Sequence, residues 1–128
     1  MQKTVYELIG GEETVRQLIK RFYEVMHTLP EAKSLRDMHP TSLQGSEDKL
    51  FMYMSGWLGG PNLFQEKFGH PRLRARHLPF QIGKAERDMW MICMVQAFED
   101  VGIQEPMRSE VLHSLLNLAD HMRNKPGE

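Results

Sequence analysis

Apolar residues recur at the spacing of an α-helix along most of this chain, and no stretch of it shows the strict alternation of a β-strand. Between residues 12 and 29 the apolar positions stand three and four apart, which places them on one stripe of a helix. Similar stretches follow over residues 46–57, over residues 85–101 and from Pro106 onward, with a shorter piece at 31–37. The pattern predicts an all-α fold.

Residues typical of helix ends bound these stretches. Thr4 and Glu7 have the spacing of a capping box, so a short turn is expected before the first long helix. Ser46 is expected to cap the third helix, because two acidic residues follow it and suit the positive helix end. The helix over 85–101 is apolar on nearly every side, which predicts that it is buried on several sides.

Size and charge limit the classes of protein that this chain can belong to. Its 128 residues suffice for one domain, which is predicted to span 1–128, and 16 Lys and Arg against 17 Asp and Glu leave no basic excess for a nucleic-acid partner. The longest apolar run is Met89 to Val95, far short of the ~20 residues that span a bilayer. No apolar signal region follows the N-terminus, and Cys93 is the only cysteine. We expect a cytoplasmic protein with no membrane insertion.

The segment over residues 59–84 does not fit the helical pattern. It has no sustained periodicity, and from Lys67 to Lys84 it carries five cations, two histidines and no acidic residue. A loop of this length in a small domain is usually functional or organised by something that it binds. Three interpretations remain open: a solvated basic loop, a nucleic-acid contact, or a site for an anionic cofactor. The neutral charge of the whole chain disfavours the second. Haem fits the third, because it is an apolar ring with two carboxylates at one edge.

Motifs spread along the chain resemble those of the group II truncated haemoglobins. They are Phe22-Tyr23, the turn at 57–61 (Trp-Leu-Gly-Gly-Pro), the basic segment at 69–80 and the stretch at 86–94. The resemblance covers nearly the whole chain. It implies a truncated globin-like two-over-two helical sandwich around haem b (iron protoporphyrin IX), with a shortened first helix and an extended loop before the proximal histidine.

The same resemblance implies that His77 is the proximal iron ligand. A neutral imidazole is a sound axial base for haem iron. The other interpretation of a lone histidine in a loop is a surface residue. His70 is the rival within the segment, but it precedes Pro71 and is expected to begin the short proximal helix without touching iron.

Other residues are implied to surround the haem. One or two of the alternating arginines, with Arg72 and Arg76 as the candidates, would pair with the propionates. Apolar side chains would pack against the ring, although each is equally consistent with plain core filling; these are Phe64, Leu73, Phe80, Ile82, Leu50 and Met54.

On the opposite side of the ring, the resemblance implies a polar distal pocket. The hydroxyl of Tyr23 and the indole N–H of Trp90 would donate hydrogen bonds to a bound ligand, and His39 would add a third polar group. His39 or Tyr23 is also a possible sixth iron ligand. Ser46 would leave an open route to the iron and Lys49 would lie at the pocket mouth. From the residues alone, Trp90 is expected to be bulky core, and His39 could be an exposed residue before a proline turn.

These implications predict a haem protein that reversibly binds dioxygen and other small diatomic ligands, among them nitric oxide and carbon monoxide. Iron-bound dioxygen carries partial negative charge, so two or three hydrogen-bond donors predict slow oxygen release. The alternative is a haem-based redox enzyme, acting in nitric oxide detoxification or as a peroxidase, with a separate reductase. A third hypothesis is a helical protein-interaction domain without haem. We expect a monomer or a weak homodimer.

Overall fold

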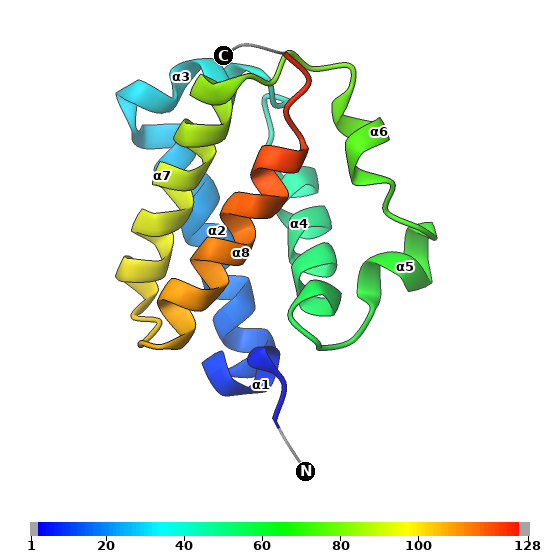
Figure 1. Ribbon diagram of the computed structural model, residues 1–128, viewed down its shortest axis with the longest axis vertical. Helices are drawn as coiled ribbons and strands as arrows, with labels where there is room; N and C mark the ends of the chain where they lie inside the picture. The colour runs from blue at the N-terminus through cyan, green and yellow to red at the C-terminus, as the bar shows by residue number, and fades with distance from the viewer. Residues whose placement is uncertain (1–2, 126–128) are drawn as a thin grey trace.

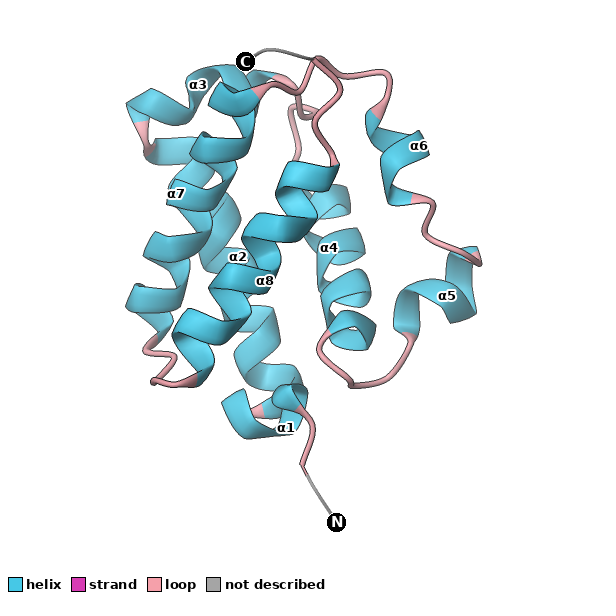
Figure 2. Ribbon diagram, in the orientation of Figure 1, coloured by secondary structure: helices cyan, strands magenta, loops and turns pink. Residues whose placement is uncertain are grey.

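The computed structural model describes residues 3–125 and contains helices, turns and no strand in that range, so the prediction of an all-α fold is confirmed (Figure 2). The helices are α1 (Val5–Ile9), α2 (Gly11–Thr28), the 3-10 helix η1 (Pro30–Ala32), α3 (Lys33–Asp37), α4 (Gln44–Trp57), α5 (Leu63–Phe68), α6 (Leu73–His77), α7 (Lys84–Val101) and α8 (Met107–His121).

Two pairs of long helices form the body of the fold (Figure 1). α2 and α4 run in opposite directions, and so do α7 and α8, which a short turn connects. α2 packs against both α7 and α4, so the two pairs are stacked as a two-over-two arrangement. The short helices α5 and α6 lie to one side, beyond α4.

The core lies where α2 meets α7 and α4, with α8 packed against α7. The apolar stripe of α2 is the face turned inward, which is the packing that its helical spacing predicts. Each large side chain that is fully buried there stabilises the fold by about 1.5–3 kcal/mol. The largest fully buried apolar side chains are Phe22, Phe98, Leu18, Ile19, Met26, Met54, Met94 and Leu115.

The capping box at the N-terminus is present, but the predicted cap of the third helix is wrong. The Thr4 hydroxyl accepts a hydrogen bond from the backbone N–H of Glu7, as its spacing predicts. The helix predicted as the third, α4, begins at Gln44, because the Leu43 carbonyl already accepts from the Glu47 N–H at 2.8 Å. Ser46 therefore lies inside the first turn and does not act as an N-cap.

Residues 59–84 contain two short helices, α5 and α6, so the prediction of an aperiodic loop is wrong in part. α6 begins at Leu73, and the expectation that His70 begins it is also wrong. A residue before proline is disfavoured in the helical region, so the chain cannot turn into the helix until Pro71 has been passed. Arg72 then takes a left-handed conformation, with φ of 48°, and its N–H donates to Nδ1 of His70 at 3.1 Å.

The prediction that α7 is buried on nearly every side is wrong for one face. Ile92 is 51% exposed and Val95 44% exposed, because α7 lies at the edge of the fold and has neighbours on its inner sides only (Figure 1). Cys93 is fully buried on the inner side, and burial raises the pKa of its thiol to about 11. Within residues 3–125 no helix is long and apolar enough to cross a membrane.

Candidate functional site

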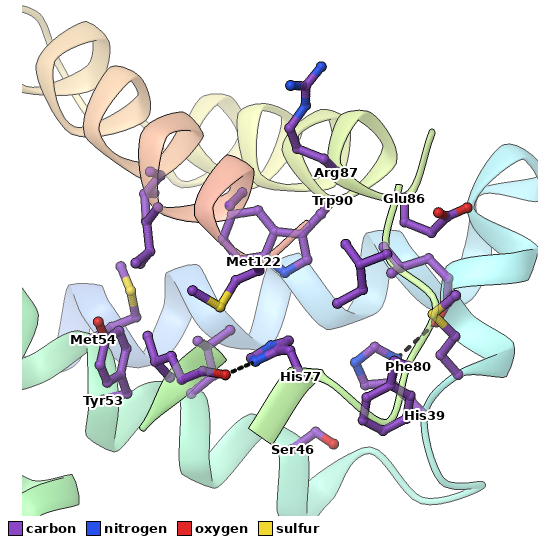
Figure 3. Close-up of a pocket in the computed structure, with 18 of the residues that line it drawn as sticks. His39, Ser46, Tyr53, Met54, His77, Phe80, Glu86, Arg87, Trp90 and Met122 are labelled. Carbon is purple, nitrogen blue, oxygen red and sulfur yellow. Dashed lines mark hydrogen bonds between the residues drawn. The ribbon is translucent and has the colours of Figure 1, made fainter. Parts of the chain in front are cut away.

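A cavity of about 320 Å³ opens between α4, α6, α7 and α8 (Figure 3). Its walls are mainly apolar, and its size falls in the range of about 300–1,000 Å³ that is typical of small-molecule sites. The cavity brings together many residues that the sequence singled out: His39, Ser46, Leu50, Met54, Leu73, His77, Phe80, Ile82 and Trp90.

His77 is the last residue of α6 and its ring lines the cavity. Nδ1 lies 2.6 Å from the carbonyl oxygen of Leu73, one turn earlier in the same helix (Figure 3). A carbonyl only accepts, so Nδ1 carries the proton, and in the neutral ring this leaves Nε2 with a free lone pair. Metal-ligating histidines are commonly oriented by such a bond from the second ring nitrogen. His77 therefore has the form that an axial iron ligand needs.

His39 lines the same cavity and is held in the same way. Its Nδ1 lies 2.9 Å from the Leu35 carbonyl oxygen, so its Nε2 also keeps a lone pair. Burial is the main cause that lowers the pKa of His39, and the positive charge of Arg36 acts in the same direction. His39 is thus neutral near pH 7, as an iron ligand must be.

Two hydrogen-bond donors, Tyr23 and Trp90, meet around Phe22. The Phe22 ring lies edge-on to the Tyr23 ring at 4.9 Å and to the Trp90 ring at 5.1 Å, and the Tyr23 ring lies 5.9 Å from His39. Burial, helped by the nearby Glu47 carboxylate, raises the pKa of Tyr23, so its hydroxyl keeps its proton. Tyr23 is not among the residues that line the cavity, but its ring lies against that of His39, which does line it.

Neither of these donors has a hydrogen-bond partner among residues 3–125. No fully enclosed side-chain nitrogen or oxygen in that part of the chain lacks a partner, so neither the Tyr23 hydroxyl nor the Trp90 N–H is fully enclosed. A buried tyrosine or tryptophan usually satisfies its polar atom. The two groups are therefore available to a ligand.

The predicted basic residues lie outside the cavity lining. The Arg76 guanidinium donates to the Pro71 carbonyl oxygen at 2.6 Å and lies 5.4 Å from the ring centre of Phe64. Lys49 is on the exposed side of α4, near the Phe68 ring. Arg72 is exposed at the start of α6. Propionates project from the edge of a haem, so the pairing of these cations with propionates stays a prediction.

Phe64 is buried in α5 but is likewise not part of the cavity wall. Its ring packs between Phe68, at 4.9 Å, and Tyr53, at 6.4 Å. Tyr53 itself lines the cavity, so Phe64 supports the wall from behind.

The structure adds residues from α7 and α8 that the sequence did not identify as part of the site, among them Arg87 and Met122. Arg87 donates to the Asp120 carboxylate at 2.6 Å, which joins the two helices beside the cavity and holds the pKa of Asp120 below its usual value. Met122 continues the apolar stripe of α8. Nothing in that stripe separates a cavity wall from ordinary core, so the sequence carried no signal for it.

The cavity fits an iron porphyrin. Its apolar walls suit the porphyrin ring, and the free lone pair of His77 suits the iron. The two donors without partners, Tyr23 and Trp90, suit a small molecule bound to the iron. In the part of the chain that the structure describes, no cluster of His, Cys, Asp and Glu could hold a bare metal ion. A single imidazole is enough when a porphyrin supplies the other four ligands.

Comparison with known proteins agrees with this geometry. The model of a family described as bacterial-like globin matches residues 4–124. A group 2 truncated haemoglobin of Bacillus subtilis is 39% identical over 120 residues, which cover 94% of this chain and 88% of that protein. The group II 2-on-2 haemoglobin of Agrobacterium tumefaciens superposes with a TM-score of 0.93 at 47% identity, covering 96% of this chain and 95% of that one. A structure described as a truncated oxygen-avid haemoglobin from Bacillus subtilis superposes with a TM-score of 0.88 at 38% identity. The superposition covers 95% of this chain and 100% of that one.

Proposed function

Because the chain belongs to the bacterial-like globins, as a group II truncated haemoglobin that holds haem and binds oxygen, we propose that His77 ligates the iron of haem b and that Tyr23 and Trp90 hold the bound gas. The observation that carries this proposal is the pair of donors without partners beside a cavity in which His77 presents a free Nε2. The name of one relative describes that protein as oxygen-avid, which supports tight oxygen binding here.

Haem supplies an iron that takes up diatomic gases and moves electron density onto them. The chain supplies the hydrogen bonds that stabilise that charge. The Tyr23 hydroxyl keeps its proton because burial raises its pKa, and the Trp90 N–H does not ionise. Hydrogen bonds to a charged acceptor are stronger than neutral ones, and the apolar walls of the cavity strengthen them further.

His39 has two possible roles in this proposal. Its neutral ring, fixed by Leu35, would let His39 act as a second protein ligand of the iron when no gas is bound. The same ring lies against Tyr23 and supports a role as a third polar contact to the gas. Tyr23 is a weaker candidate for ligation, because an iron-bound phenolate needs a proton to leave and burial opposes that.

Absorption and resonance Raman spectra of the haem-loaded protein test the proposal and the role of His39 together. We expect a ferrous form that gives stable, reversible oxygen and carbon monoxide spectra. We also expect a six-coordinate low-spin ferric spectrum that becomes high-spin in His39→Phe and is unchanged in Tyr23→Phe. A protein that takes up haem but is oxidised at once by oxygen would contradict reversible binding. A high-spin, water-bound ferric spectrum that is identical in all three proteins would exclude His39 and Tyr23 as the sixth ligand.

Other parts of the expected function stay predictions that belong to this proposal. They are the binding of nitric oxide, dependence on a separate reductase for any turnover, the cytoplasmic location, and the monomeric or weakly dimeric state. Mixing the oxygenated protein with nitric oxide in a stopped-flow instrument distinguishes simple binding from enzymatic consumption.

A further inference from the structure

The side chain of Asn124, just beyond the end of α8, makes three hydrogen bonds to the backbone of the segment that carries His77. Its Nδ2 donates to the carbonyl oxygen of Phe80 at 2.8 Å and to that of His77 itself at 3.2 Å. Its Oδ1 accepts from the N–H of Ile82 at 3.0 Å. One amide thus joins three backbone groups over residues 77–82.

Further bonds tie the same two parts of the chain together. The backbone N–H groups of Asn124 and Lys125 donate to the Ile82 carbonyl oxygen at 2.9 Å and 3.2 Å. From α6, the Arg74 guanidinium donates to the carbonyl oxygens of His121 and Arg123 at 2.6 Å and 2.9 Å, which lie at the end of α8. The end of α8 and the segment 74–82 therefore form one hydrogen-bonded unit.

Apolar packing contributes little to the position of this segment. α6 is five residues long and contains no buried residue, and Leu78 and Phe80 are 58% and 42% exposed. A helix of that length is not stable by itself in water. The polar contacts to the end of α8 are thus the main interactions that fix the position of the segment that carries His77.

We propose that Asn124 is a positioning residue for the proximal histidine, acting on the iron through His77. This inference rests on the proposed function, because it assumes that His77 is the iron ligand. The Nδ2 donor holds the His77 carbonyl and the Oδ1 acceptor holds Ile82, so the amide fixes both ends of the turn that follows α6. Without it, the ring of His77 samples a wider range of tilts.

Asn124→Ala and Asn124→Asp test the proposal, with Asn117→Ala as the matched control from the exposed face of α8. In the haem-loaded ferrous protein, we expect the iron–histidine stretching band to broaden and shift in both Asn124 variants and to stay unchanged in Asn117→Ala. The rate of hemin loss should rise about tenfold in Asn124→Ala. This corresponds to about 1.4 kcal/mol, which is within the net contribution expected of the three side-chain hydrogen bonds that are lost. Unchanged band and loss rate in Asn124→Ala would overturn the proposal.

Hydrogen exchange of the protein before haem is added provides a readout that does not depend on the cofactor. The Ile82 amide should lose its protection in Asn124→Ala and keep it in Asn124→Asp, which retains the oxygen acceptor but not the donors. Core amides such as those of Met94 and Phe98 should be unaffected. Loss of protection throughout the chain would mean a general structural role and would contradict positioning. If the wild-type protein failed to bind hemin while the Ile82 result held, the proposed function would fail. The hydrogen bonds by which Asn124 holds residues 77–82 would still be supported.

Discussion

We expect oxygen to leave a Tyr23→Phe, Trp90→Phe double variant about 10²- to 10⁴-fold faster than it leaves the wild-type protein. Each hydrogen bond to a charged acceptor contributes about 1.5–3 kcal/mol, and about 1.4 kcal/mol corresponds to a factor of ten. Both substitutions keep an aromatic ring at each position while the two donors disappear. Stopped-flow displacement of oxygen by excess carbon monoxide measures the rate.

A matched double variant, Tyr6→Phe with Trp57→Phe, controls for the loss of one hydroxyl and one indole. Neither residue lines the cavity, so its oxygen dissociation rate should equal that of the wild type. Carbon monoxide carries less negative charge than oxygen, so its own dissociation should change much less in the distal variant. Equal oxygen rates in the wild type and the Tyr23, Trp90 variant would show that the two donors do not hold the gas.

Replacement of Phe22 by alanine is expected to lower the free energy of unfolding by about 3–5 kcal/mol, the usual cost of removing a large aromatic side chain from a core. Phe22 is fully buried, and its ring touches both Tyr23 and Trp90. The loss is a large part of the stability of a typical small domain, about 5–15 kcal/mol in total. Urea unfolding of the protein without haem, followed by circular dichroism, measures it.

Leu116→Ala is the control for Phe22→Ala, because Leu116 lies on α8 and is 38% exposed. Leu116→Ala should lower the free energy of unfolding far less than Phe22→Ala does. The decrease for Phe22→Leu should lie between those of the two alanine variants. If the free energy of unfolding of Phe22→Ala were within about 1 kcal/mol of the wild-type value, the contact between α2 and α7 would not be the packed centre of the fold.

The sequence predicted the long helices well, because their apolar residues follow one face with a period that only a helix has. The stripe of α2 from Val15 to Met26 is the buried face in the structure. The errors lie where the tertiary structure overrides what the local sequence favours. Ser46 has the chemistry of a cap, yet the helix begins two residues before it. Ile92 and Val95 are apolar, yet the fold leaves their side of α7 uncovered.

The candidate site was predictable only in part. His77, His39 and Trp90 are separated by up to 51 positions in the chain, and periodicity could not bring them together; the resemblance to truncated haemoglobins did so. Arg87 and Met122 could not be identified, because a salt bridge between two helices and a cavity wall look the same in sequence as a surface charge and a core residue. The hydrogen bonds of Asn124 to residues 77–82 likewise depend on a contact across more than 40 positions.

Hemin titration of the wild-type protein beside His77→Gly, followed at the Soret band, tests most directly whether this cavity holds haem through one imidazole. We expect the wild type to saturate at one equivalent. The variant should bind hemin weakly and, after reduction with dithionite, regain the ferrous five-coordinate spectrum when free imidazole is added, with His70→Gly behaving like the wild type. A wild-type protein that folds but takes up no hemin, or a His77→Gly protein with an unchanged spectrum, would contradict the account.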